Sequence, residues 1–174
     1  MSINLVKSMK YGVLMGLGFC FYTIMMWLTK LDSVYLSIGQ YFDMAIIILP
    51  LAIISLGIYQ QNKLNGITLL QRVFVAILIG AVSFVIYNPF LYLYHHVINP
   101  DWFNAVLALK EIELTKGGLA QDLIAAQLEV MRNSPVAQAK MFQLSSMIAS
   151  VLVIPILISF ITLLFIKKNN NQAN

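Results

Sequence analysis

Charged residues are scarce in this chain of 174 residues, where they account for 10% of the sequence. Soluble domains usually carry about 25% charged residues. The single cysteine, Cys20, excludes an internal disulfide and any four-cysteine metal site. The sequence also has no Walker phosphate-binding tract, no dinucleotide-binding fingerprint and no G-x-S-x-G nucleophile motif. We therefore expect neither enzymatic activity nor a cofactor.

Apolar residues, in contrast, make up 60% of the chain, and its mean hydropathy is +0.82. The four longest runs without Asp, Glu, Lys or Arg contain 19, 19, 28 and 26 residues and are Tyr11–Thr29, Met44–Asn62, Val73–Pro100 and Met141–Ile166. A helix of about 20 apolar residues crosses the hydrocarbon core of a bilayer. The pattern predicts an all-α integral membrane protein, with one membrane domain over residues 1–174 and transmembrane helices at about 9–29, 38–60, 69–97 and 141–166.

The first run could instead be a secretory signal, because Lys7 and Lys10 precede it. The apolar core of a signal peptide has roughly 7–15 residues and ends at a small-x-small cleavage site. The run here is longer, and the nearest small-x-small sequence, Ser37-Ile38-Gly39, lies too far beyond it. We expect an uncleaved membrane span.

The basic residues indicate the orientation of the spans. The two tails and the connection at about 62–72 hold six basic residues and no acidic ones, whereas the other two connections hold five basic residues and all seven acidic ones. Short cytoplasmic segments are enriched in Lys and Arg. Both termini are therefore predicted to be cytoplasmic. The net charge of +4 follows from this distribution and indicates no nucleic-acid partner.

The one sizeable polar region, about residues 99–134, lies between the third and fourth spans and is predicted to be extracytoplasmic. Asn99 and Pro100 indicate a helix start, with Asn99 as N-cap and Pro100 in the first turn. This helix should run to about Lys116, before a glycine pair, with Trp102, Val106 and Leu109 on one side.

A second, amphipathic helix is predicted over residues 119–132. Its apolar residues form one stripe with a second stripe beside it: Leu119, Leu123 and Val130, then Ile124, Leu128 and Met131. Asn133-Ser134-Pro135 predicts the start of a last helix that continues straight into the fourth span. We therefore expect a helical hairpin whose apolar face covers the bundle or a protein partner.

Several short motifs occur in a characteristic order. They are Gly57-Ile58-Tyr59, Asn65-Gly66-Ile67-Thr68, Tyr92 with Tyr94, Ile98-Asn99-Pro100-Asp101-Trp102 and Asn133-Ser134-Pro135. Their order and spacing resemble the DUF4199 family, small four-span membrane proteins found mainly in Bacteroidota. The chain departs from the family where uncharged Gln60-Gln61-Asn62 replaces a stretch that is often charged. The resemblance implies the bacterial inner membrane, and it assigns no catalytic residues.

Asp43 is the most notable charge in the spans. If the second helix starts near Val34, Asp43 lies within the hydrocarbon, where an ionisable residue is costly and indicates a function. If the span starts at Met44, Asp43 lies at the outer interface, beside Tyr41 and Phe42. The aromatic neighbours favour the interface.

His95 and His96, at the outer end of the third span, are the second set of candidates. Adjacent positions on a helix point about 100° apart, so the two rings cannot easily bind one metal ion. No other His or Cys cluster completes a zinc site. We expect two interfacial polar residues and no metal.

Prolines interrupt three spans, at Pro50, at Asn88-Pro89 and at Pro155. Such breaks form binding sites in some transporters, and they also occur as simple kinks. Small residues spaced by four, such as Gly12 with Gly16 and Ala76 with Gly80, allow helices to approach closely. We expect these glycines to serve packing within the chain rather than dimerisation.

Two functions are compatible with these features. The first is a non-enzymatic envelope protein that binds a membrane or periplasmic protein through its hairpin or bundle surface. The alternative is a small transporter or channel, which would need to be a homo-oligomer because four spans enclose little polar volume. Because the spans hold no charged pathway, the first hypothesis is favoured.

Overall fold

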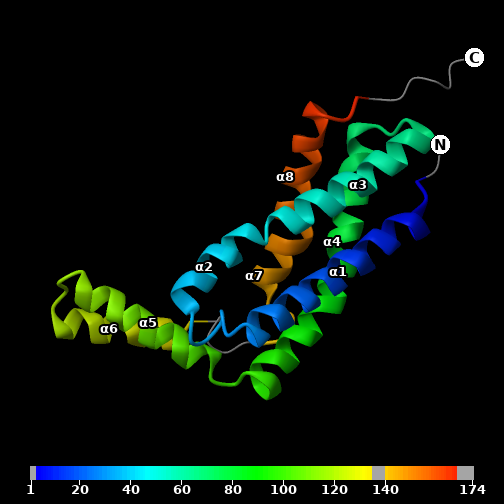
Figure 1. Ribbon diagram of the computed structural model, residues 1–174. Helices are drawn as coiled ribbons and strands as arrows, with labels where there is room; N and C mark the ends of the chain where they lie inside the picture. Colours follow the sequence, from blue (N-terminus) through cyan, green and yellow to red (C-terminus); the bar gives the residue numbers. More distant parts are fainter. Residues whose placement is uncertain (1–2, 135–139, 168–174) are drawn as a thin grey trace, which may run out of the picture. The chain divides into compact units, whose positions relative to one another are not determined.

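The computed structural model describes residues 3–134 and 140–167, and every regular element within these ranges is a helix. The elements are α1 (Leu5–Leu28), α2 (Leu36–Ala45), α3 (Ile48–Asn65), α4 (Leu69–Leu93), η1 (Tyr94–Ile98), α5 (Trp102–Lys116), α6 (Gln121–Arg132), α7 (Leu144–Met147), η2 (Ile148–Val153), α8 (Ile154–Ile161) and η3 (Thr162–Leu164) (Figure 1).

Four helical stretches of the described chain are long and apolar enough to cross a membrane. They are Leu5–Leu28, Leu36–Leu64, Leu69–Ile98 and Leu144–Leu164. Many of their large apolar side chains face outward; Leu70 and Leu164 are 79% and 78% exposed. Extensive apolar surface of this kind needs lipid around it. The predicted all-α class with four membrane helices is confirmed.

The second span consists of two helices, α2 and α3, separated by a turn at Ile46 and Ile47. Pro50 explains the break, because proline has no N–H and its ring clashes with the carbonyl four residues earlier. A tighter turn replaces the missing bond, in which the Leu49 N–H donates to the Ile46 carbonyl at 3.0 Å.

The third span begins with a reciprocal cap. The Thr68 N–H donates to Gln71 Oε1 at 2.8 Å, and the Gln71 N–H donates to Thr68 Oγ1 at 3.4 Å, which satisfies two backbone donors of the first turn. Helix α4 then continues through Pro89 and ends in the wider π-helical turns of η1.

The fourth span begins at Leu144, and the expectation of one helix from Pro135 into the span is wrong. Pro135 itself lies outside the described residues, but residues 140–143 are not helical. Phe142 has a positive φ of 56°, a left-handed conformation that a continuing right-handed helix excludes.

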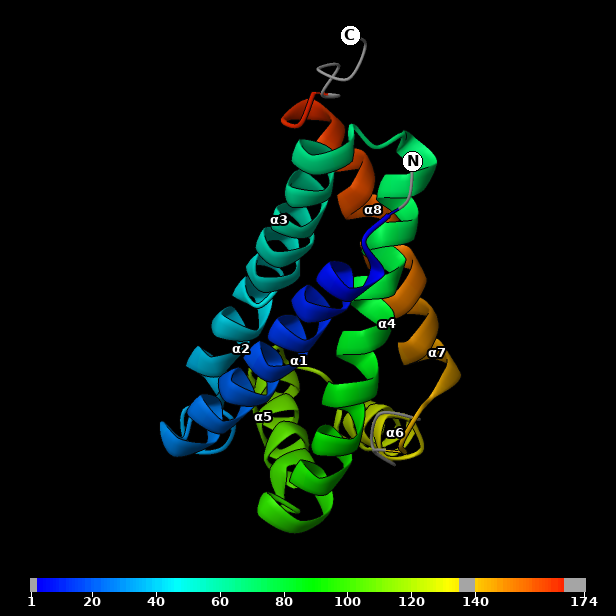
Figure 2. The same ribbon diagram turned by 90° about the vertical axis from the view of Figure 1, so that its right-hand side faces the viewer.

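Contacts divide the chain into two compact units. Unit 1 contains Met1–Cys20, Ile46–Asn88 and Leu144–Asn174. Helices α3 and α8 lie side by side in it, as both views show (Figures 1 and 2). Its core residues are Met15, Ile53, Ile54, Ile58, Ile67, Val75, Ala76, Ile79 and Ile158. Eight of these nine residues come from four helices and Ile67 comes from the connection between α3 and α4, so the core holds the parts of α1, α3, α4 and α8 in this unit together.

Unit 2 contains Phe21–Ala45 and Pro89–Gln143. Helices α5 and α6 pack against each other in it, around buried Leu107, Ile124 and Leu128. The stripe of α5 in this core also includes Phe103 and Leu114, and so it is not the predicted side with Trp102.

The start of α5 also differs from the prediction. The helix begins at Trp102 and follows Asp101, so Asn99 is not its N-cap. The Asn99 side chain instead donates to Asp32, which is distant in sequence. Helix α6 begins at Gln121, two residues after the predicted position 119. Its two apolar stripes separate: Ile124 and Leu128 are buried, whereas Leu123 and Val130 are 54% and 72% exposed.

Candidate functional site

Asp43 lies inside α2 and is therefore part of a helix that begins at Leu36, well before Met44. Its side chain is exposed, and the Tyr22 hydroxyl donates to its Oδ1 atom at 3.2 Å. Both residues belong to unit 2. One hydrogen bond from a tyrosine leaves most of the carboxylate open, so it can accept further donors from outside the chain.

A second carboxylate, Asp32, forms a polar cluster that was not predicted from the sequence. Tyr94 donates its hydroxyl to Asp32 Oδ2, and Asn99 Nδ2 donates to the same oxygen at 2.8 Å. The Asn99 amide also donates to the Tyr94 hydroxyl at 3.1 Å. The Tyr94 side chain is 3% exposed, and Asp32 Oδ1 is buried without a hydrogen-bond partner among the described residues.

The backbone around Asp32 explains how this cluster forms. Lys30, two residues after the end of α1, has a positive φ of 57°, and the Leu31 N–H donates back to the Met26 carbonyl at 2.9 Å, which turns the chain away from the helix axis. The Leu31 carbonyl then lies against Gly39, where any Cβ would overlap it. An acidic residue after the first span was the available signal, but its partners follow the third span.

His95 and His96 have different surroundings, as their adjacent positions predict. His95 is half-buried between Tyr94 and Trp102, with ring centroids 5.2 and 4.2 Å away. His96 is exposed and stacks on Tyr92 at 4.1 Å. Among the described residues, no group of three or more His, Cys, Asp or Glu could hold a metal ion. The histidines therefore contribute to an aromatic cluster in unit 2.

Asn88 and Pro89 lie inside the third span, but they do not break it. Helix α4 continues through Pro89, and Asn88 is 9% exposed. A buried amide needs hydrogen-bond partners, and a proline frees a carbonyl in the preceding turn. The pair therefore lies within one continuous helix, and the expected interruption of the third span is not found at Pro89.

The three glycines singled out from the sequence lie at close helix contacts in unit 1. A Cβ on Gly12 would be 2.6 Å from Val82 Cβ, and one on Gly16 would be 2.9 Å from Ile86 Cβ. A Cβ on Gly80 would be 2.7 Å from Pro155 Cγ. These glycines let α1 approach α4 and let α4 approach α8, contacts within one chain.

Buried polar groups join the helix ends in unit 1, and the sequence analysis missed them as well. Arg72 is 2% exposed, and its Nη2 atom donates to the Ile166 carbonyl at 2.7 Å. Asn62 Nδ2 donates to the Lys167 carbonyl at 2.8 Å. The last carbonyls of a helix carry partial negative charge, so a buried cation there is stabilising. These bonds attach the end of the fourth span to α3 and α4.

Unit 2 contains an apolar groove of about 420 Å³ on α6. Its described lining residues are Leu123, Ala126, Gln127, Val130 and Met131. Because α6 buries Ile124 and Leu128 against α5, this groove belongs to a second apolar face. A helix that buries one face and leaves another apolar face open has unused binding surface.

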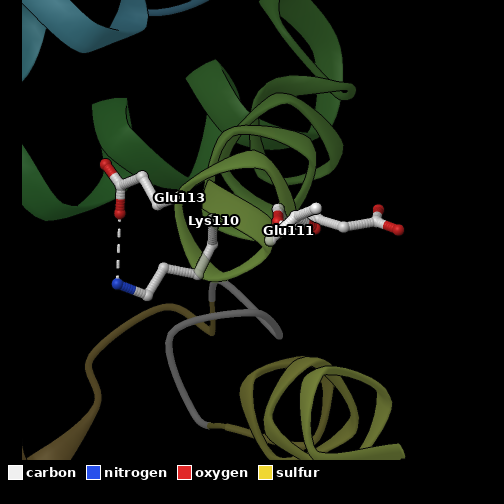
Figure 3. A network of polar contacts seen from close by, with 4 residues as sticks. Lys110, Glu111 and Glu113 are labelled. Carbon is white, nitrogen blue, oxygen red and sulfur yellow. Dashed lines mark hydrogen bonds and ion pairs between the residues drawn. The ribbon is translucent and has the colours of Figure 1, made fainter. Parts of the chain in front are cut away.

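Charged side chains lie on different sides of α5 (Figure 3). Figure 3 shows Lys110 and Glu113 paired at 3.1 Å, with Glu111 pointing away from them. Their side chains are 41% and 44% exposed, and exposed ion pairs contribute at most about 1 kcal/mol. The Lys110–Glu113 ion pair therefore adds little to the stability of α5.

The clusters described above contain hydrogen bonds, aromatic contacts and an apolar groove, but no activated nucleophile with its base. Comparison with curated proteins and with solved structures gives no match. The family model of DUF4199, described as a protein of unknown function, matches residues 10–168. This match spans nearly the whole chain and confirms the resemblance noted in the sequence. The chain is a member of the DUF4199 family.

Proposed function

We propose that this protein is a non-enzymatic multi-pass protein of the bacterial inner membrane that binds a protein partner through α6. The observation that carries the proposal is the apolar groove on α6. Leu123 and Val130, which line it, are 54% and 72% exposed, although α6 has already buried its other apolar face. An amphipathic helix of a partner fits such a groove by placing its own apolar stripe there.

The charges along the groove specify the chemistry of the partner. Asp122, Ala126 and Glu129 follow one another at helical spacing, so two carboxylates border the groove on the side of Ala126. We therefore propose a partner helix with Lys or Arg along one edge of its apolar stripe. An anionic lipid surface would be repelled by this border. A second copy packed antiparallel on α6 would bring the acidic borders together, which is also unfavourable.

A pair of designed helical peptides tests the proposal directly. Both carry the same leucine stripe, and one has lysines along its edge while the other has glutamates. The full chain is held in a nanodisc of neutral lipid, and binding is measured by fluorescence anisotropy against the empty nanodisc. We expect the lysine peptide to bind about tenfold or more tightly, because two close charge pairs replace two repulsions.

Two substitutions in α6 provide the matched controls. Val130→Asp places a charge in the groove and should weaken lysine-peptide binding by about tenfold, since an unpaired charge must be buried. Ala125→Asp places the same charge on the opposite, exposed side of the helix and should leave binding unchanged. Equal binding of both peptides, or equal effects of both substitutions, would contradict the proposal.

A second copy of the chain and a lipid are the two alternative occupants of the groove, and each would give a distinct result. In a Cys20→Ala background, Ala126→Cys would form a disulfide-linked dimer if the groove held a second copy, with Ala125→Cys as control. Equal peptide binding to the empty nanodisc would indicate lipid as the occupant. Either result overturns the proposal of a basic protein partner.

One observation favours a second candidate, a small oligomeric transporter. The second span breaks at Ile46 and Ile47, three residues after exposed Asp43. Broken helices beside a polar residue form ion or substrate sites in several transporter folds. Cysteine labelling along the third span, in membranes, tests this candidate. A stripe of water-accessible positions would support a pore, and a labelling pattern without one would reject it.

A further inference from the structure

The charges of unit 1 are all of one sign. Its segments, residues 1–20, 46–88 and 144–174, contain six basic residues and no acidic ones. The hydrogen bonds of this unit bring the start of α1 and the end of α3 together at one end (Figures 1 and 2). Basic side chains from two helices therefore belong to this end of the unit.

A buried amide network fixes the relative position of these two helices. Gln61 Nε2 donates to the Asn4 carbonyl at 2.7 Å and to Ser8 Oγ at 2.9 Å, and the Asn4 N–H donates to Gln61 Oε1 at 3.2 Å. Gln61 and Ser8 are 1% and 0% exposed. Because these polar groups form hydrogen bonds with one another between α1 and α3, they hold the two helix ends in a fixed relative position.

Three lysines lie close in sequence to the residues of this hydrogen-bond network. Lys7 Nζ donates to Gln60 Oε1 at 3.2 Å, which uses one of its three donors and bridges α1 to α3. Lys10 lies one turn after Lys7 on α1, and Lys63 lies one turn after Gln60 on α3. Three lysines on adjoining turns of α1 and α3 therefore belong to this end of the unit, and Lys7 joins the two helices through Gln60.

The same helix faces become apolar farther along the spans. Leu14 is seven residues after Lys7, and Leu56 is seven residues before Lys63, so each lies on the face of its lysine. Their side chains are 54% and 51% exposed. Each face therefore offers a basic end and an apolar continuation, which match the headgroup and the acyl chains of a lipid.

We propose that the lysines at the junction of α1 and α3, Lys7, Lys10 and Lys63, bind the headgroup phosphate of an anionic phospholipid. The phosphodiester accepts hydrogen bonds from the ammonium groups, and the acyl chains lie along the apolar faces. A zwitterionic lipid brings its own ammonium group, which the three lysines repel. Basic sites between membrane helices recognise anionic headgroups by this chemistry. The site is independent of the groove on α6.

Binding of an acyl-labelled phosphatidylglycerol to the full chain in neutral detergent tests the proposal. We expect phosphatidylglycerol to compete at least about tenfold better than phosphatidylcholine. Each lysine near a lipid phosphate contributes roughly a fivefold change in affinity, so Lys7→Gln with Lys63→Gln should weaken binding by about 25-fold. Lys7→Arg with Lys63→Arg keeps both charges and should retain binding within about twofold.

The controls separate a lipid site from general attraction by positive charge. Lys110→Gln with Lys116→Gln removes two charges from α5 and should leave lipid binding unchanged. If the Lys7 and Lys63 double variant fails to fold, exposed Lys10 provides the test, and Lys10→Gln should cost about fivefold. Equal competition by phosphatidylcholine, equal loss in the α5 control, or competition by millimolar inorganic phosphate as effective as that by lipid would each overturn the proposal.

Discussion

At the scale of single residues, the buried contacts of Tyr94 and Arg72 show how this chain satisfies polar groups within apolar surroundings. Tyr94 donates to Asp32, and Arg72 donates to backbone carbonyls at the end of the fourth span. A buried polar group without a hydrogen-bond partner costs free energy. The contribution of Tyr94 and Arg72 to stability therefore depends on whether their partners are present. Substitutions that remove one partner should therefore be more costly than their small volume change indicates.

Tyr94→Phe tests this expectation, because it removes one hydroxyl and keeps the ring. Asp32 Oδ2 would retain only the bond from Asn99, and the free energy of unfolding should fall by about 1–3 kcal/mol. Thermal unfolding of the purified chain in detergent measures the change.

Tyr92→Phe is the matched control, since Tyr92 is 40% exposed, and it should have little effect. In the Asp32→Asn background, Tyr94→Phe should cost less than in the parent chain, because the charged acceptor is gone. The same loss in both backgrounds would mean that the hydroxyl does not stabilise the chain through Asp32.

At the scale of the elements, close approach between helices depends on the side of each helix that carries small residues. Gly80 is an example, because α4 meets the fourth span there at two rigid groups: a Cβ would lie 2.7 Å from Pro155 Cγ and 2.9 Å from the Ser150 carbonyl oxygen. In lipid, apolar burial provides no drive for association, so such close contacts are what hold the helices together.

Gly80→Ala should therefore destabilise the chain, with an overpacking cost of about 1–3 kcal/mol. Gly18→Ala is the control, because its Cβ would meet the flexible end of Leu49 at 3.1 Å. Alanine gains up to about 1 kcal/mol of helix propensity at either position, so the difference between the variants reports packing. Unfolding temperatures in detergent provide the comparison, and equal temperatures would argue against a rigid contact at Gly80.

At the scale of the whole molecule, the distribution of charge between the two units has a consequence for topology. All seven acidic residues belong to unit 2, and unit 1 has none. Basic segments are retained on the cytoplasmic side during insertion. Both tails and the connection near Lys63 should therefore be cytoplasmic, and α5 and α6 should be extracytoplasmic.

Reporter fusions test this orientation in living cells. Alkaline phosphatase fused after Lys116 should be active, because the enzyme requires the oxidising periplasm for its disulfides. Fusions at Lys63 and after Lys168 should be inactive with this reporter and fluorescent with a cytoplasmic one. A cytoplasmic signal from the Lys116 fusion would reverse the orientation and exclude an extracytoplasmic partner for α6.

Features that depend on local length and composition could be predicted from the amino-acid sequence. Four apolar runs predict four membrane helices because the bilayer requires about 20 apolar residues in any span, wherever the neighbours lie. The family could also be identified from the sequence, because its motifs are short tracts of neighbouring residues in a fixed order. The helix end at Lys116 followed from a glycine pair beside it, which is local information too.

Which helix faces are buried, and which polar groups pair, depends on contacts made in the folded chain. Both stripes predicted for α6 consist of large apolar residues, and the position of α5 determines that Ile124 is buried and Leu123 is exposed. Asn99 has the sequence of an N-cap, but Asp32 offers its amide a charged acceptor from another segment. Contacts between residues distant in sequence form only when the chain folds, so a local sequence pattern does not show which of these residues will lie close together.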